Sequence, residues 1–249
     1  MSDPYYRDWA GHYDQHARGV PGDVEFYVRL AAETEGLVVE LGVGTGRIAI
    51  PSAAAGARVL GIDLEPAMLA IARDHARAAG VEERLTLVEG DMRAFEVPEA
   101  AALVTIPFRA FLHNLTTEDQ LATLGACFRA LRPGGRLVLN LFNPSLPLIA
   151  HWMGKGPRHW EPFPGGGSAD TQAQNAYAPT GQQVTTRVRA RDADGVWRKT
   201  TFTLRYVYRY EMEHLLARAG FAVDALYGDF EGARFREEST EMVWIARRP

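Results

Sequence analysis

Three glycines, Gly42, Gly44 and Gly46, follow the apolar run 37–41 at every second position. Because glycine has no Cβ, such a turn lets the backbone bend sharply and lets a ligand approach it without meeting side chains. A helix that begins directly after the turn offers unpaired N–H groups to a polar part of that ligand. The segment therefore predicts a cofactor loop between a strand and a helix.

Acidic residues stand at the ends of the next two apolar runs. Asp63 follows the run 58–62, where Rossmann-type sheets place a carboxylate that accepts hydrogen bonds from ribose hydroxyls. Asp91 comes shortly after the run 85–89. Each acid taken alone is equally well explained as a cap of the helix or turn that follows it. Together with the glycine turn, in this order, the two acids predict a cofactor site at the carboxyl edge of a parallel sheet.

The spacing of the glycines bears on which cofactor is bound. The loop reads Gly42-x-Gly44-x-Gly46, with Glu40 just before it, whereas the dinucleotide fingerprint is G-x-G-x-x-G. The chain also has no second mononucleotide-binding half that would hold a nicotinamide. An NAD-dependent dehydrogenase is therefore the third choice of function, and a cofactor titration would separate it from the others.

The elements that must position these residues follow from the alternation of short apolar runs with helical patterns. Such alternation is typical of a parallel sheet with crossover helices. The capping box Thr117 with Gln120 marks the start of one further helix. The segment 132–135, Arg-Pro-Gly-Gly, predicts a turn into the next strand. The predicted strands cover 37–41, 58–62, 85–89, 101–106 and 136–142, and the predicted helices cover 47–55 and 66–79.

The alternation ends after residue 142. Residues 143–181 are rich in proline and glycine, which predicts a long loop, and its part 154–181 is expected to be a mobile lid. An Asp-Gly turn at 192–195 then predicts a β-hairpin. The elements expected in this part of the chain are hairpin strands over 183–191 and 196–210, a helix over 211–219, and strands over 222–229 and 240–247.

We therefore expect one α/β domain over residues 1–249, built on a Rossmann-like, seven-stranded, mostly parallel sheet with helices on both faces. Its cofactor-binding core would span 37–142. An N-terminal helical cover and a β-hairpin or lid insertion after strand five would form a cap from 1–30 and 143–210. The remaining residues, 211–249, would supply the last helix and strands.

Composition narrows the function class. The net charge of −4 argues against a nucleic-acid partner, which normally requires a basic face. The one cysteine, Cys127, permits no intrachain disulfide and no cysteine metal cluster, and we expect no metal site. No apolar run approaches the roughly 20 residues of a membrane span, and the polar N-terminus lacks an export signal. These features predict a cytoplasmic protein without a membrane partner; they leave the oligomeric state open.

Four segments carry a family resemblance. They are Glu40-Leu-Gly-Val-Gly-Thr-Gly-Arg, Gly61-Ile-Asp-Leu-Glu-Pro-Ala-Met-Leu, Glu89-Gly-Asp-Met-Arg and Leu131-Arg-Pro-Gly-Gly-Arg-Leu. In this order they resemble the successive motifs of class I S-adenosylmethionine-dependent methyltransferases. The resemblance covers about residues 37–142 and implies S-adenosylmethionine as the cofactor.

The resemblance also implies a role for each matching residue. The three glycines would border the methionine part of the cofactor, and Glu40 would orient their loop or reach the amino group. Asp63 would hold the ribose, while Asp91 and Met92 would meet the adenine. Tyr13 resembles an N-terminal tyrosine that covers the cofactor, although a helix-packing aromatic is an equally good interpretation. The remaining expected cofactor contacts are Leu64, Met68 and Ile106.

The acceptor is expected to be a small molecule. After the strand 101–106, nucleic-acid methyltransferases of the N6-adenine type carry Asn/Asp-Pro-Pro-aromatic, whereas this chain continues with Pro107-Phe108. His113 could serve as a general base or merely as a capping residue. Arg109 could bind an acidic substrate group in bidentate fashion or form a surface ion pair.

Methylation of nitrogen is slightly preferred over methylation of oxygen in this interpretation. The alternatives are a non-catalytic S-adenosylmethionine-binding regulatory module and an aminopropyl transferase of the same fold. The latter would need an acidic polyamine channel, which the segment 143–210 does not predict.

Overall fold

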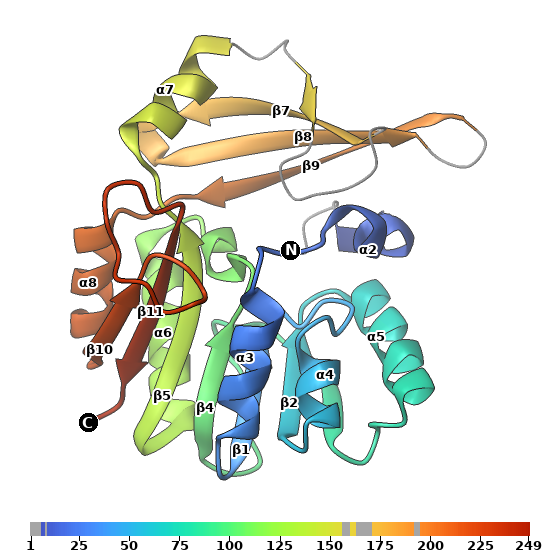
Figure 1. Ribbon diagram of the computed structural model, residues 1–249, viewed down its shortest axis with the longest axis vertical. Helices are drawn as coiled ribbons and strands as arrows, with labels where there is room; N and C mark the ends of the chain where they lie inside the picture. The colour runs from blue at the N-terminus through green and yellow to red at the C-terminus, as the bar shows by residue number, and fades with distance from the viewer. Residues whose placement is uncertain (1–5, 8, 156–159, 163–170, 192–194) are drawn as a thin grey trace.

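The computed structural model describes residues 6–7, 9–155, 160–162, 171–191 and 195–249 (Figure 1). Its main feature is a seven-stranded sheet with the order β10-β11-β5-β4-β1-β2-β3. Only β11 runs antiparallel to its neighbours, β10 and β5. The strands are β1 (Leu37–Leu41), β2 (Arg58–Asp63), β3 (Leu85–Glu89), β4 (Ala101–Ile106), β5 (Leu131–Phe142), β10 (Ala222–Tyr227) and β11 (Glu241–Arg247).

Helices cover both faces of this sheet because its central strands present apolar side chains on both sides. In β1, Val38 packs with the helices α3, α4 and α5, whereas Val39 and Leu41 pack with α6 and α8. The predicted Rossmann-like, mostly parallel fold is confirmed. The helices are α3 (Asp23–Ala32), α4 (Ala49–Ala54), α5 (Pro66–Ala79), α6 (Thr117–Ala130) and α8 (Arg209–Arg218).

Helix α5 shows why the sequence predicted these elements well. Glu65 caps it by accepting a hydrogen bond from the Ala67 backbone N–H at 3.3 Å, and Pro66 occupies the first turn. Gly80 ends the helix with a φ of 66°, a conformation that glycine adopts without steric cost. The predicted range 66–79 is therefore confirmed at both ends.

A second, antiparallel sheet forms a cap above the carboxyl edge of the main sheet (Figure 1). Its strand order is β6-β7-β8-β9, and helix α7 packs against β7. The N-terminal elements lie between this cap and α5, and Trp9 packs against Val188 and Ala190 of β8. The cap elements are η1 (Ala10–His12), α2 (Tyr13–His16), α7 (Leu146–Lys155), β6 (Glu161–Pro162), β7 (Thr171–Ala178), η3 (Pro179–Gly181), β8 (Gln183–Arg191) and β9 (Trp197–Arg205).

Several boundaries differ from the sequence prediction. The N-terminal cover expected over 1–30 is shorter, because Phe26 and Tyr27 of α3 pack on the main sheet. The prediction of a capping box formed by Thr117 and Gln120 is wrong. The residue before it, Thr116, has the extended backbone that an N-cap needs, and its Oγ1 accepts from the Asp119 N–H at 3.1 Å.

The turn expected at 132–135 is instead the irregular start of β5. The strand begins at Leu131, and its register against β4 shifts between Ala101 and Leu103. At the other end of the cap, the strand expected over 196–210 ends at Arg205, and α8 already begins at Arg209. The turn at 192–194 lies outside the described residues, but the two strands that it joins pair as predicted.

The long loop expected over 143–181 contains a helix and two strands. The prediction of a loop over 171–178 is wrong, because β7 pairs with β8 along its whole length. The mobility expected for 154–181 stays a prediction. Residues 156–159 and 163–170 of the expected lid lie outside the described part of the chain. Within the described ranges, no helix combines the length and apolarity that a membrane span requires.

Hydrogen exchange should distinguish a paired β7 from a lid. The amides of Thr171–Ala178 that bond to β8 should exchange much more slowly than those of the exposed loop 231–234, even in the free protein. Strand β8, paired on both sides, serves as the internal reference. Exchange of the 171–178 amides at loop-like rates would contradict the sheet and restore the lid.

Candidate active site

The glycine turn after β1 adopts a backbone that only glycine tolerates well. Gly42, Gly44 and Gly46 have φ values of 71°, 56° and 88°. A Cβ on Gly46 would lie 2.6 Å from Ile50 Cδ1, so the turn packs directly on the helix that follows. The predicted loop therefore presents bare backbone at the carboxyl edge of the sheet.

Asp63 fixes the position of this loop from the end of β2. Its Oδ2 accepts from the Gly44 N–H at 2.7 Å, and its Oδ1 accepts from the Glu65 N–H at 2.9 Å. Burial raises the pKa of Asp63, while these backbone donors act in the opposite direction. The neighbouring Leu64 is 40% exposed and Met68 is buried beneath Gly44. Of these two predicted contacts, only Leu64 presents its side chain at the surface.

Glu40 is a buried carboxyl group one residue before the end of β1. It is 4% exposed, and burial raises its pKa to about 8. Arg47 acts to lower this pKa, and the negative charges of Asp63 and Asp23 act to raise it. Arg47 itself is held by both oxygens of Asp23, at 2.8 and 2.6 Å. The site thus concentrates three acids around one arginine.

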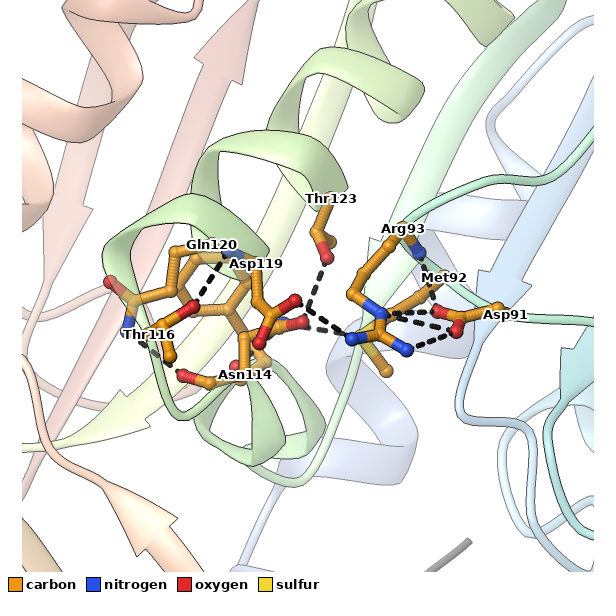
Figure 2. Close-up of polar contacts among 9 residues, drawn as sticks. Asp91, Met92, Arg93, Asn114, Thr116, Asp119, Gln120 and Thr123 are labelled. Atoms are coloured by element: carbon orange, nitrogen blue, oxygen red, sulfur yellow. Dashed lines mark hydrogen bonds and ion pairs between the residues drawn. The ribbon is translucent and has the colours of Figure 1, made fainter. Parts of the chain in front are cut away.

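Figure 2 shows the expected adenine side of the site. The Asp91 carboxylate accepts from the Arg93 side chain, with an Nη2–Oδ2 distance of 2.6 Å, and these bonds lower the pKa of Asp91. Arg93 also binds Asp119 of α6 at 2.7 Å. Asn114 donates to the Met92 sulfur at 3.4 Å. Asp91 and Met92 are therefore clamped in place from α6 and η2 (Ala110–His113) rather than standing alone.

Ile106 is the predicted site residue that the structure places deepest. Its side chain is completely buried in the core of the main sheet. A cofactor contact from this position would have to come from its backbone. Tyr13, by contrast, lines the cavity beneath the cap, and burial raises its pKa well above the ordinary value.

The N-terminal segment is tied down over the glycine loop. The Thr45 hydroxyl donates to Asp14 Oδ1 at 2.5 Å, so α2 bonds directly to the loop that Asp63 positions. Tyr6 lies 5.9 Å from Tyr13 between ring centroids, and both rings line the cavity. The predicted N-terminal cover therefore extends over the carboxyl edge of the sheet.

A cavity of about 1170 Å³ lies between the cap and the main sheet. Its lining comes from the N-terminal segment, η2, the end of β5, α7, the cap sheet and the loop before β11. Aromatic rings dominate this lining and come from Tyr6, Tyr13, Phe108, Phe142, Trp152, Phe202, Tyr208, Tyr210 and Phe235. A concave, mostly apolar space with a few polar groups is the usual form of a small-molecule site.

His113 and Arg109 both reach this cavity, as predicted from their place after β4. His113 Nε2 lies 2.7 Å from the Tyr6 hydroxyl, and burial lowers the pKa of His113 to about 4. Arg109 forms an ion pair with the buried Glu241 and lies over the Phe142 ring at 5.5 Å. Bidentate capture of an acidic substrate group by Arg109 would first require this ion pair to open.

Comparison with known proteins agrees with this geometry. Residues 38–135 match the family model described as a methyltransferase domain. A demethylmenaquinone methyltransferase from Thermus thermophilus is 39% identical over 112 residues, which are 43% of this chain and 47% of that protein. The chain thus spans about half the length of this relative.

Two solved structures share the fold. The CcbJ methyltransferase from Streptomyces caelestis superimposes with a TM-score of 0.84 at 24% identity, over 100% of this chain and 99% of the other. An amino pentose methyltransferase from Micromonospora echinaspora gives 0.66 at 22% identity, over 100% of both chains. Residues 38–135 of this chain therefore match a methyltransferase domain, and the whole chain shares the fold of these two methyltransferases.

The structure brings most of the predicted residues to one edge of the sheet. The sequence analysis missed Arg93, Asn114 and Asp119, which hold Asp91 and Met92 in place, and it missed Tyr6. Only Tyr6 had a recognisable signal. Tyr6, Trp9 and Tyr13 recur three and four positions apart, the spacing of one helical face.

The free energy of unfolding should show the cost of burying Glu40. The pKa of Glu40 rises from 4.5 to about 8 on folding, so folding takes up a proton and the protein loses stability as pH rises through this range. Glu40→Gln removes this loss. The free energy of unfolding of the variant, relative to that of wild type, should therefore rise by roughly 3–4 kcal/mol from pH 5 to pH 8.

Urea unfolding at the two pH values measures this difference. Glu89→Gln, which removes an exposed carboxylate from the end of β3, is the control for the loss of a charge. If Glu40→Gln changes the free energy of unfolding equally at pH 5 and pH 8, Glu40 is ionised in the folded protein over this whole range.

Proposed function

We propose that this protein transfers the methyl group of S-adenosylmethionine to a small-molecule acceptor bound beneath the cap. The observation that carries the proposal is the Asp63–Gly44 hydrogen bond, which holds the carboxylate expected to bind the ribose against a bare glycine loop. This pair stands at the carboxyl edge of a parallel sheet, and Thr45 of the same loop bonds to Asp14, the neighbour of Tyr13, which lines the aromatic cavity. Ligands of open α/β sheets bind at this edge.

The residues present fit the cofactor. A carboxylate offers about four acceptor positions, so Asp63 can accept from ribose hydroxyls while it holds Gly44 and Glu65. Asp63 and Asp23 provide negative charge near the expected place of the methionine ammonium, and Glu40, whose buried carboxyl has a pKa of about 8, can ionise when that cation binds. Asp91 and Met92, clamped as Figure 2 shows, would meet the adenine.

When bound, the cofactor supplies an electrophilic methyl group on a positively charged sulfur. The protein then has to hold the acceptor in line with that methyl group and exclude water. The aromatic cavity serves both purposes, since its rings shape a rigid apolar space and give few hydrogen bonds to water. Its volume of about 1170 Å³ accommodates an acceptor larger than a single sugar ring.

The chemistry of the cavity favours nitrogen over oxygen as the methylated atom. A hydroxyl acceptor needs a base, but His113 with a pKa of about 4 takes up protons poorly at neutral pH. An amine attacks in its neutral form without one. Glu237 and Glu238 line the exposed side of the cavity, where they would attract a cationic amine.

The similar structure of an amino pentose methyltransferase agrees with an amine acceptor. Its name describes that enzyme, however, and the acceptor of this chain has to be identified directly. We extend the proposal to residues 1–249 acting as one domain, because the cap supplies most of the cavity wall.

Incubation of the protein with methyl-labelled S-adenosylmethionine and a metabolite extract tests the proposal. Mass spectrometry should reveal a labelled small molecule, with the label on nitrogen. A label on oxygen would overturn the preference for nitrogen. Cofactor binding without any labelled product would favour a non-catalytic binding module, and transfer of an aminopropyl group from the decarboxylated cofactor would indicate an aminopropyl transferase.

Asp63→Ala should weaken binding of S-adenosylmethionine by about 1.5–3 kcal/mol, the range of charge-assisted hydrogen bonds. Titration calorimetry measures the affinity. Asp74→Ala makes the same change in charge at a side chain that is 75% exposed on α5, and it should bind normally. If Asp63→Ala keeps wild-type affinity with an intact fold, Asp63 does not hold the ribose.

A further inference from the structure

Four aromatic side chains meet at the inner wall of the cavity although they come from distant parts of the chain. The ring of His113 lies 5.2 Å from Tyr6 in an edge-on arrangement and 6.3 Å from Phe202 of β9. Tyr13 lies 5.9 Å from Tyr6 on the other side. All four line the cavity, so the cluster faces the space assigned to the acceptor.

Within this cluster, Tyr6 and His113 form one polar pair, with 2.7 Å between the Tyr6 hydroxyl and His113 Nε2. Burial lowers the pKa of His113 to about 4, so its imidazole is neutral at neutral pH. The wall of the cavity thus carries a hydrogen-bonded pair with a neutral imidazole.

We propose that Tyr6 contacts the acceptor nitrogen directly and that His113 positions the Tyr6 hydroxyl from behind. The proposal rests on the proposed function, and it changes the role expected for His113 from base to positioning residue. When Nε2 accepts the phenol hydrogen, the lone pairs of the Tyr6 oxygen stay available to accept an N–H of the amine. That bond turns the nitrogen lone pair toward the methyl group.

The reaction balances without a protein base. The nitrogen lone pair forms the new N–CH₃ bond, the S–CH₃ bond breaks, and its electron pair stays on the sulfur, which becomes neutral. The nitrogen becomes an ammonium ion, and its extra proton passes to water after release. Because positive charge grows on the nitrogen, its N–H bond to Tyr6 strengthens in the transition state. The faces of Tyr13 and Phe202 would stabilise the same charge.

The tyrosine hydroxyl also has a structural reason to be held. Tyr6 belongs to a short N-terminal segment that contacts the core through His113 and the cap through Trp9. The hydrogen bond to the buried His113 ring in η2 gives the Tyr6 hydroxyl a defined direction.

Kinetics of three variants with methyl-labelled S-adenosylmethionine and the acceptor isolated from the extract test this inference. Tyr6→Phe should lower kcat about tenfold to hundredfold, the range of a hydrogen bond to a charged group, with cofactor affinity unchanged. His113→Phe should lower kcat similarly. His113→Gln should keep kcat within about threefold of wild type, because its amide oxygen can still accept from the phenol.

The double variant Tyr6→Phe/His113→Phe should be no slower than the slower single variant, since both changes remove one unit. Tyr227→Phe, which removes a phenol hydroxyl on β10 away from the cavity, is the matched control. Wild-type kcat in Tyr6→Phe would overturn the inference. A second pattern would also overturn it: His113→Gln lowers kcat as much as His113→Phe does, while Tyr6→Phe lowers kcat only slightly. In that case His113 itself would take the proton.

These outcomes remain distinct from failure of the proposed function. If wild-type protein binds the cofactor but transfers no methyl group to any acceptor, the function proposed above is wrong, and the role of Tyr6 is overturned with it. If wild-type protein is active and the variants behave otherwise than expected, only the role of the pair is wrong.

Discussion

The hydrogen bonds from the Gly44 and Glu65 backbones to Asp63 are the contacts on which the rest of the site depends. They join the end of β2 to the loop after β1 and to the start of α5. A carboxylate held by two backbone donors cannot rotate away, so the loop and the acid form one rigid unit. The N-terminal segment then bonds to the same loop through Thr45 and Asp14.

A second constraint is electrostatic. Burial raises the cost of ionising Glu40, the negative charges of Asp63 and Asp23 add to it, and Arg47 compensates only in part. Such a site favours a ligand that carries positive charge. Arg47 also lies over the Phe108 ring at 5.2 Å, and Phe108 lines the aromatic cavity.

The cap is the part of the fold that the sequence predicted least well. Strand β7 has the sequence Thr-Gln-Ala-Gln-Asn-Ala-Tyr-Ala, which lacks the β-branched apolar residues that mark a strand. It forms because every residue of β7 pairs with a residue of β8. No local sequence pattern in β7 predicts this pairing. Strand β8 alternates buried and exposed residues from Gln183 to Arg191, and its boundaries were predicted correctly.

The sequence by itself determined the parts that local geometry governs: the glycine turn, the acid Asp63 at the end of β2, the proline start and glycine stop of α5, and the positions of the central strands along the chain. Tertiary structure alone decided which distant side chains meet. Tyr6 and His113 are 107 positions apart, and Arg109 and Glu241 are 132 apart. Turns and caps follow from neighbouring residues, whereas these pairs exist only after the sheet and its cap have packed together.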